Sequence, residues 1–217
     1  MQNKRYSTLI FDLDGTLVDS FYEIYDTLKK TCLFFCIEPL SRALTQSFIG
    51  PGAEHLLRAA IGEHPIELSV FRQKFNSFYH DGQLEKTPLF EGVLDVLGSL
   101  KDQQFSLNIL SNKPYDSILI LLKQLGIVSY FDIIVGPETT GYPKPAIEGM
   151  MHVVDLCQAD VSSCLFVGDT HTDLLTAQKA GVDALLVAYG YGDELVLKTE
   201  FELLGVLDSL GDIFTYL

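Results

Sequence analysis

Short apolar runs of strand length recur along the chain, and each ends at a polar residue or a glycine. Five such runs cover Thr8–Phe11, Ser106–Leu110, Ile133–Val135, Cys164–Val167 and Ala184–Ala188. Amphipathic segments with helical periodicity separate most of them, over Glu91–Gln103, Tyr115–Leu125, Ala146–Leu156 and Thr172–Ala180. Continuously apolar strands that alternate with helices are typical of a parallel sheet buried on both faces. The pattern therefore predicts an α/β fold with a Rossmann-like, doubly wound parallel sheet.

The stretch from about Asp19 to Leu84 breaks this alternation. Two helical patterns, "FYEIYDTLKKTCLFF" and "PIELSVFRQKFNSFYH", lie on either side of the loop "FIGPG", and no convincing strand occurs between them. This predicts an all-α domain of residues 18–84, inserted into an α/β core domain of residues 1–17 and 85–217. The last segment, "FELLGVLDSLGDIFTYL", predicts a short strand and a closing helix.

Composition and charge narrow the range of partners. The 217 residues are 47% hydrophobic and 20% charged, which is a globular composition. The formal net charge of −14 disfavours nucleic acid and anionic membranes as partners, because both require a basic surface. The four cysteines include no CxxC pair, and no apolar run resembles a signal peptide or is long enough to span a membrane. We therefore expect a cytoplasmic protein.

Polar side chains follow three of the predicted strands at the point where each strand ends. Asp12 and Asp14 follow the first strand, and Gly15 permits the turn after them. Ser111–Lys113, "SNK", follows the second strand, and the segment "GDTHTD" with Asp169 and Asp173 follows the fourth. Because ligands bind at the carboxyl ends of strands in an open α/β sheet, we expect these residues to converge.

Several carboxylates at one sheet edge repel each other unless a hard cation lies among them. Mg²⁺ prefers oxygen ligands and commonly joins carboxylates to a substrate phosphate, so the pattern favours a magnesium site. The alternative is that Asp12 and Asp173 cap helices and Asp169 merely ends a strand. The expected convergence of these aspartates with Ser111 and Lys144 at one edge of the sheet disfavours that alternative.

The motifs "DLDGT", "LVDS", "SNK", a Lys-Pro segment and "GDTHTD", in this order, resemble those of the haloacid dehalogenase-like hydrolase superfamily. The resemblance is greatest to its phosphoglycolate phosphatase-like branch and covers nearly the whole chain. It implies that the inserted helical domain is a cap, that the cofactor is Mg²⁺ and that the substrate is a small phosphorylated metabolite.

The resemblance also implies a role for each motif residue. Asp12 would be the nucleophile that forms an aspartyl-phosphate, and Asp14 would be the general acid and base. Ser111 and the backbone N–H of Asn112 would bind phosphoryl oxygens. The metal ligands that the resemblance implies are the side chains of Asp12 and Asp169 and the backbone carbonyl of Asp14, with Asp173 supporting the metal's shell.

One segment departs from the family pattern. Relatives usually open a Lys-Pro-x-Pro segment with the catalytic lysine, whereas this chain reads "GYPKPAIEGM". If Pro145 matches the second proline, Tyr142 occupies the lysine position; if Lys144 is the match, Ile147 replaces that proline. We expect Lys144 to be the working cation, with Lys113 as the second candidate. The alternative for Lys144 is a solvated charge in a loop.

The predicted cap carries weaker signals. Ser47–Gly52, "SFIGPG", resembles a substrate-facing cap loop in which glycines such as Gly50 let the backbone approach a substrate. A plain turn between two helices is the alternative. Arg42, Arg58 and Arg72 are candidates to pair with a substrate carboxylate or a second phosphate, although most surface arginines are simply solvated.

The favoured function is therefore a Mg²⁺-dependent phosphatase that acts as a monomer or homodimer. A phosphosugar mutase of the β-phosphoglucomutase type is an alternative, in which a sugar hydroxyl replaces water as the phosphoryl acceptor. A non-catalytic binding protein on the same scaffold is a second alternative. The presence of Asp12, Asp14, Ser111 and Asp169 disfavours that last alternative.

Overall fold

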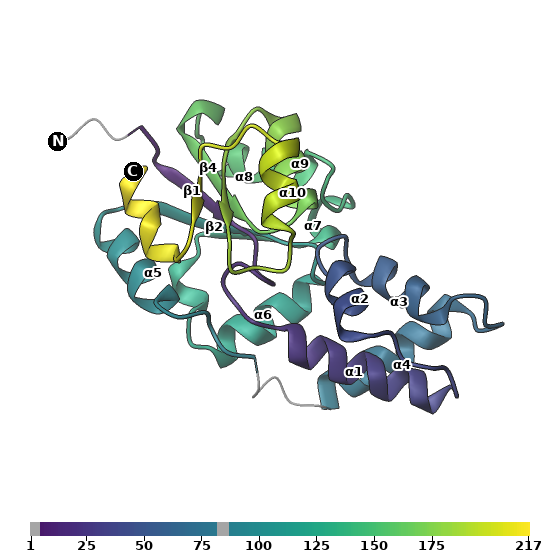
Figure 1. Ribbon diagram of the computed structural model, residues 1–217. Helices are drawn as coiled ribbons and strands as arrows, with labels where there is room; N and C mark the ends of the chain where they lie inside the picture. The colour runs from purple at the N-terminus through teal and green to yellow at the C-terminus, as the bar shows by residue number, and fades with distance from the viewer. Residues whose placement is uncertain (1–4, 82–86) are drawn as a thin grey trace.

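The computed structural model describes residues 5–81 and 87–217, and its centre is a parallel sheet of six strands. The strand order is β3-β2-β1-β4-β5-β6 (Figure 1). The strands are β1 (Thr8–Phe11), β2 (Ser106–Leu110), β3 (Ile133–Val135), β4 (Cys164–Gly168), β5 (Asp183–Val187) and β6 (Gly205–Leu207). All five pairings are parallel, which confirms the predicted doubly wound α/β sheet.

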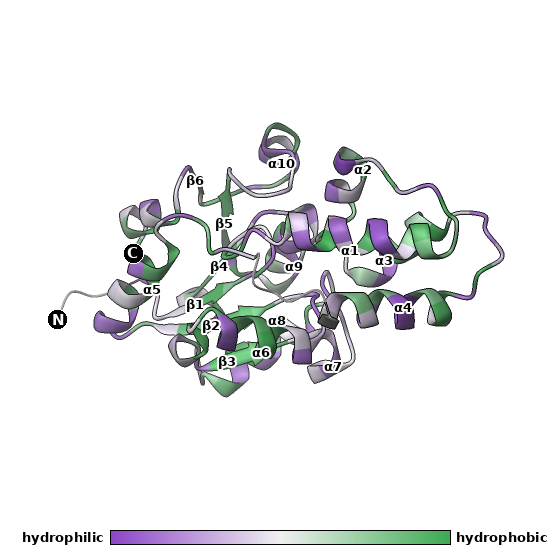
Figure 2. Cartoon of the chain, turned by 90° about the horizontal axis from the view of Figure 1, so that it is seen from below, coloured by the Kyte–Doolittle hydropathy of each residue, from purple (hydrophilic) through white to green (hydrophobic). Residues whose placement is uncertain are grey.

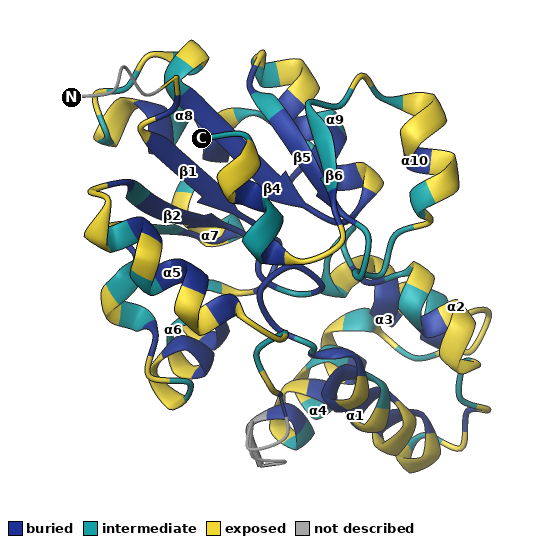
Figure 3. Cartoon of the chain, turned by 60° about the vertical axis from the view of Figure 1, so that its left-hand side comes forward, coloured by how far each residue is buried: buried dark blue, intermediate teal, exposed yellow. Residues whose placement is uncertain are grey.

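Helices cover both faces of the sheet because alternate strand residues point to opposite sides. In β1, Leu9 and Phe11 pack into one hydrophobic cluster and Ile10 packs into another. The first cluster is covered by α5 (Val93–Asp102), α6 (Tyr115–Gln124) and the 3₁₀ helix η4 (Leu210–Thr215); the second is covered by α8 (Glu148–Leu156), α9 (His171–Ala180) and α10 (Glu194–Glu200). Figure 3 shows the inner strands β1 and β4 as buried, and Figure 2 shows β5 as hydrophobic, as this arrangement requires.

A group of four helices follows β1 and lies beside the α/β core (Figure 1). We call this segment, residues 21–81, the helical insertion; its helices are α1 (Phe21–Phe34), α2 (Arg42–Ser47), α3 (Ala53–Ile61) and α4 (Leu68–Asp81). The Phe35 ring, just after α1, stacks on Phe71 of α4 with centroids 5.4 Å apart. The loop "FIGPG" separates α2 from α3. The predicted boundary between residues 84 and 85 lies outside the described residues.

The remaining elements differ from the sequence prediction in small ways. Strand β5 is one residue earlier than predicted, and the C-terminal segment forms the predicted strand β6 but ends in the 3₁₀ helix η4. The short helices α7 (Pro137–Thr140) and α10, and the 3₁₀ turns η2 (Val128–Tyr130) and η3 (Val161–Ser163), were not predicted. Within the two described ranges, no helix has both the length and the apolar character needed to cross a bilayer.

The sheet has a topological switch point at β1. From this strand the chain builds β2 and β3 on one side, whereas β4, β5 and β6 lie on the other. Phe11, the last residue of β1, lies opposite Ile109 of β2 and Val167 of β4, so the three carboxyl ends are level. A crevice at this position is where open α/β sheets bind ligands.

Candidate active site

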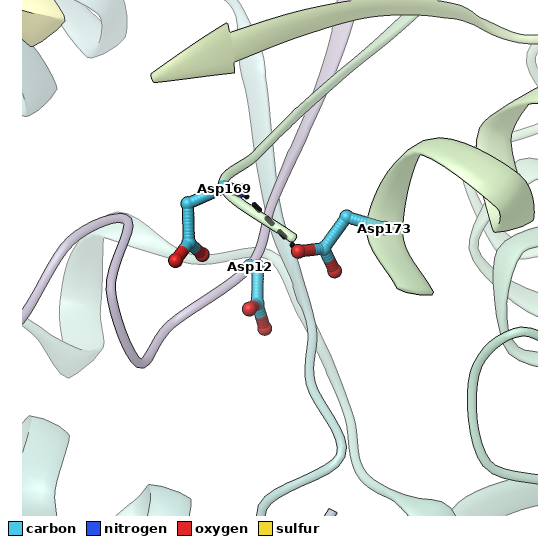
Figure 4. Close-up of side chains that lie close together, drawn as sticks. All are labelled: Asp12, Asp169 and Asp173. Carbon is cyan, nitrogen blue, oxygen red and sulfur yellow. Dashed lines mark hydrogen bonds between the residues drawn. The ribbon is translucent and has the colours of Figure 1, made fainter. Parts of the chain in front are cut away.

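Three aspartates meet at the carboxyl ends of β1 and β4. Asp12 follows β1, Asp169 follows β4, and Asp173 is the third residue of α9 (Figure 4). Each offers a carboxylate oxygen within 4.8 Å of the others, and all three residues are buried. The parallel register of the two strands causes this meeting, and the Asp12 N–H donates a hydrogen bond of 2.9 Å to the carbonyl of Val167. The predicted convergence of Asp12, Asp169 and Asp173 is therefore confirmed.

Hydrogen bonds fix the two carboxylates that follow β4. The backbone N–H and the hydroxyl of Thr170 donate to Asp173 Oδ2, at 2.9 and 2.7 Å. The Thr16 hydroxyl donates to Asp169 Oδ1 at 3.0 Å, and the Tyr191 N–H donates to Asp169 Oδ2 at 2.7 Å. Asp173 therefore caps helix α9, as the alternative interpretation of this residue expected. Its other oxygen, Oδ1, faces the cluster and accepts a bond from Lys144.

Gly15 brings the turn after β1 against this cluster. Its φ is +89°, and a Cβ atom at this position would collide with the Asp169 carboxylate. Both the backbone conformation and the close approach therefore require glycine. The motif glycine thus allows the Asp14 segment and Asp169 to share one site.

Lys144 supplies a positive charge to the cluster. Its Nζ atom lies 2.8 Å from Asp12 Oδ1 and 2.6 Å from Asp173 Oδ1. Lys144 is 4% exposed, whereas Tyr142 is 56% exposed. The alternative of a solvated loop charge at Lys144 is therefore wrong, and the structure places Lys144 rather than Tyr142 beside the predicted nucleophile.

Asn112 holds the backbone of Lys144 in place. The Lys144 N–H donates to Asn112 Oδ1 at 2.7 Å, and Asn112 Nδ2 donates to the Lys144 carbonyl at 2.9 Å. The same amide nitrogen donates to the Gly50 carbonyl at 3.0 Å. The Asn112 side chain thus joins the lysine loop to the helical insertion, a role that the sequence did not indicate.

The cluster carries more negative than positive charge. Burial raises the pKa of Asp12, and the neighbouring Asp173 raises it further against the opposing effect of Lys144. Burial, with the charges of Asp173 and Asp12, raises the pKa of Asp169 well above its usual range. A divalent cation would relieve this repulsion, and carboxylate oxygens are the ligands that Mg²⁺ and similar hard cations accept. The donor set of Asp12, Asp169 and Asp173 therefore fits such an ion.

A second ion pair joins Asp14 to Lys113. Lys113 Nζ lies 3.1 Å from Asp14 Oδ1 and 3.3 Å from Oδ2, and 5.1 Å from the centre of the Tyr79 ring. Burial disfavours the charged lysine, but Asp14 and Tyr79 together outweigh burial and raise the pKa of Lys113. Lys113 is therefore the ion-pair partner of Asp14, and Lys144 is an ion-pair partner of Asp12.

Glu23 of α1 is a buried acid near this second pair. The hydroxyl groups of Thr87 and Tyr79 both donate hydrogen bonds to its Oε2 atom. Burial raises the pKa of Glu23 despite these donors and the nearby Lys113. Glu23 was not identified from the sequence, where it is one of several charged positions in an amphipathic helix.

A cavity of about 80 Å³ opens between the α/β core and the helical insertion. Its core wall consists of five of the polar residues already described and two residues of the segment that follows them. These are Asp12, Asp14, Ser111, Asn112, Lys113, Pro114 and Ser117. Its opposite wall comes from the helical insertion, and consists of Ile24, Phe48, Ile49, Gly50, Gly52, Ala53, Leu56, Phe75, Asn76 and Tyr79. All of the predicted catalytic and substrate-binding residues except Lys144 thus line this cavity, and Lys144 contacts one of them, Asp12.

The loop of Ser47–Gly52 does more than turn the chain. Gly50 has a φ of +105°, and a Cβ atom there would lie 2.7 Å from Thr170 Cγ2. Together with the bond from Asn112, this close contact places the loop against the polar end of the cavity. The predicted approach of Gly50 to the site is observed.

The predicted arginines are engaged elsewhere. Arg58 and Arg72 each pair with Glu54 at 2.7 Å. The Arg42 guanidinium lies over the rings of Tyr22 and Tyr25, 5.4 Å from each centroid. None of these arginines belongs to the described residues that line the cavity.

Known proteins share both the sequence and the fold. A family model described as "haloacid dehalogenase-like hydrolase" matches residues 9–187. A phosphoglycolate phosphatase from Pseudomonas fluorescens is 31% identical over 209 residues, which cover 93% of this chain and 76% of that protein. A pyrophosphatase from Listeria welshimeri is 29% identical over 177 residues, which cover 81% of this chain and 80% of that protein.

The solved structures agree at the level of fold. A protein from Haemophilus somnus, named as a predicted phosphoglycolate phosphatase, superposes with a TM-score of 0.89 over 98% of both chains at 24% identity. This likeness extends over the sheet and the helical insertion together.

Proposed function

The chain belongs to the haloacid dehalogenase-like hydrolase family and is a phosphatase, and we propose that it hydrolyses a small phosphorylated metabolite through an aspartyl-phosphate, with Mg²⁺ as cofactor. One observation carries this proposal. The buried carboxylate of Asp12 faces a cavity that also contains Asp14 and Ser111, and Lys144 lies 2.8 Å from the same carboxylate. A nucleophile, a second acid and a hydroxyl donor around one cavity are the groups that covalent phosphoryl transfer needs.

In the first step, a carboxylate oxygen of Asp12 attacks phosphorus and the bond from phosphorus to the leaving oxygen breaks. Asp14 donates a proton to that oxygen, so the product leaves as an alcohol. Lys113, 3.1 Å from Asp14, fixes the position of this acid. The Ser111 hydroxyl and the Asn112 N–H bind phosphoryl oxygens and stabilise their charge during the transfer.

In the second step, water attacks the phosphorus of the aspartyl-phosphate. Asp14, now ionised, accepts a proton from this water, and the bond between phosphorus and the Asp12 oxygen breaks. Inorganic phosphate leaves, and both carboxyl groups return to their starting states. Lys144, in contact with Asp12, offsets the charge of the carboxylate that is released.

The metal site uses the same edge of the sheet. We propose that the side chains of Asp12 and Asp169 and the backbone carbonyl of Asp14 hold Mg²⁺. Asp173 supports this site indirectly: its Oδ1 atom accepts a bond from Lys144, and its Oδ2 atom accepts one from Thr170. When bound, Mg²⁺ supplies positive charge that offsets the negative charge of the phosphoryl group and of the carboxylates.

We further propose that residues 18–84 act as a cap domain over a core of residues 1–17 and 85–217. The cavity between the helical insertion and the core supports this division, because each part contributes one wall. A cap that closes over the substrate excludes bulk water, and its opening releases the product.

Phosphate release from p-nitrophenyl phosphate and a panel of small phosphate esters, with Mg²⁺ and with EDTA, tests this function. We expect release that depends on Mg²⁺, that is lost in Asp12→Asn and that persists in Asp155→Asn. Asp155 is an exposed acid on α8 and controls for the change of charge.

Two results would contradict the proposal. One is the absence of phosphate release from every ester by folded protein with Mg²⁺ present. The other is isomerisation of a sugar monophosphate, primed by its bisphosphate, without stoichiometric release of phosphate, which would identify a mutase.

A further inference from the structure

The wall of the cavity opposite the phosphoryl site is apolar. Six large side chains of the helical insertion form most of it: Ile24, Phe48, Ile49, Leu56, Phe75 and Tyr79. All but Phe48 are buried members of the main hydrophobic cluster, and Phe48 packs against it. A phosphate ester bound to Asp12 would therefore place its leaving group against hydrocarbon.

The size of the cavity favours a small leaving group. Its volume of about 80 Å³ is shared with the phosphoryl group, because Asp12, Asp14 and Ser111 belong to the same lining. A short alcohol suits this space better than a nucleoside does.

The charges around the cavity disfavour a second anionic group on the substrate. The cavity already contains the carboxylates of Asp12 and Asp14, and Lys113 is paired with Asp14 at 3.1 Å. The arginines of the insertion that could pair with such a group are bound to Glu54 or lie over tyrosine rings. A carboxylate on the leaving group would lose water without gaining an ion pair, which is costly.

We infer that this site prefers phosphate monoesters whose leaving group is a small, uncharged and largely apolar alcohol. Esters that carry a carboxylate or a second phosphate on that group are poorer substrates. The inference rests on the proposed phosphatase function and extends it to a substrate class. Asn76, an exposed residue that also lines the cavity, provides an amide for one hydroxyl or carbonyl of the alcohol.

A pair of isosteric esters tests this preference. 3-Methylbutyl phosphate and 3-phosphooxypropanoate differ in one terminal group, isopropyl in the first and carboxylate in the second. We expect kcat/KM with Mg²⁺ to be at least about tenfold higher for 3-methylbutyl phosphate. Equal values, or a preference for the carboxylate ester, would overturn the inference while phosphate release itself would uphold the phosphatase. If neither ester nor p-nitrophenyl phosphate is hydrolysed, the phosphatase function fails and the inference fails with it.

Two arginine variants test whether the wall itself sets the preference. Asn76→Arg adds a cation at an exposed position that lines the cavity, and we expect it to raise kcat/KM for 3-phosphooxypropanoate about tenfold relative to 3-methylbutyl phosphate. Gln73→Arg adds the same charge one turn earlier on α4, at an exposed position outside the lining. We expect this control to leave the ratio unchanged. Equal shifts in both variants would show that net charge, and not the cavity wall, controls specificity, and would overturn the inference.

Discussion

The ammonium group of Lys144 lies 2.8 Å from the Oδ1 atom of Asp12, and both side chains are almost completely buried. The same group lies 2.6 Å from Asp173, so one lysine is shared between two of the clustered acids. This arrangement neutralises part of the cluster and leaves the remaining charge for a divalent cation. It also links the irregular lysine segment of the sequence directly to the proposed nucleophile.

Replacement of Lys144 by methionine removes the charge and keeps the length of the side chain. We expect kcat/KM to fall by about 10²–10³-fold, because a preorganised charge beside the reacting group is lost. The metal-free protein should also lose about 3 kcal/mol of unfolding free energy, because buried carboxylates are left without their partner. Steady-state kinetics and urea unfolding measure the two effects.

The matched control for this variant is Tyr142→Ala. Tyr142 is 56% exposed, so its loss should change the unfolding free energy by less than about 0.5 kcal/mol and leave kcat/KM unaffected. A large loss of activity in Tyr142→Ala with little change in Lys144→Met would show that the cation has been assigned to the wrong residue.

Mg²⁺ should stabilise the folded protein even without a substrate. An ion that binds the native state at 100 times its Kd adds about 2.7 kcal/mol to the free energy of unfolding. We therefore expect thermal unfolding to shift upward with added Mg²⁺ in the wild type and in Asp155→Asn, and to remain unchanged in Asp169→Asn. A wild-type melting temperature that does not respond to Mg²⁺ would argue against the metal site.

Glu23 should make stability depend on pH. Because burial raises its pKa above the usual 4.5, the native state holds this proton more tightly than the unfolded state. Stability from this group is therefore present at low pH and is lost as the pH rises from about 4.5 through the raised pKa. Urea unfolding across this range should show Glu23→Gln gaining stability relative to the wild type as the pH increases.

The control for the pH series is Glu63→Gln, at an exposed position after α3. Its unfolding free energy should follow that of the wild type at every pH. If Glu23→Gln also follows the wild type, Glu23 does not carry a raised pKa in the folded protein.

The sheet could be predicted closely from sequence because its inner strands are buried on both faces. β1, β2 and β3 begin and end where their apolar runs do, and the convergence of Asp12 with Asp169 follows from parallel pairing alone. The short helices of the insertion were harder to predict, because the six residues of α2 are too few to show a helical period.

Details of the site depend on loop paths that no local pattern encodes. Lys113 follows β2 and Lys144 lies in the loop between α7 and α8, and only the folded chain shows which carboxylate each lysine contacts. The bonds that hold Asp169, from the Thr16 hydroxyl and the Tyr191 N–H, join residues far apart in sequence. A backbone donor has no side-chain signature, so the contribution of Tyr191 could not be found from the sequence.

The last prediction compares two glycines of the helical insertion that both have positive φ. Gly50 (φ +105°) lies against Thr170, whereas Gly62 (φ +56°) has no atom within 4 Å of the position of a Cβ. An alanine at either position adds backbone strain of about 1–2 kcal/mol. At Gly50 the added methyl group must also push the loop away from Thr170 and from the amide of Asn112.

We therefore expect Gly62→Ala to lower the unfolding free energy by this strain alone and to keep full kcat/KM. Gly50→Ala should lose stability as well and should reduce kcat/KM by about 10- to 100-fold, because small displacements of groups at a reacting centre have large effects on rate. Urea unfolding and kinetics on the same two variants separate strain from positioning. If Gly50→Ala keeps wild-type kinetics, the loop is a plain turn, and its contact with Asn112 has no part in holding the site.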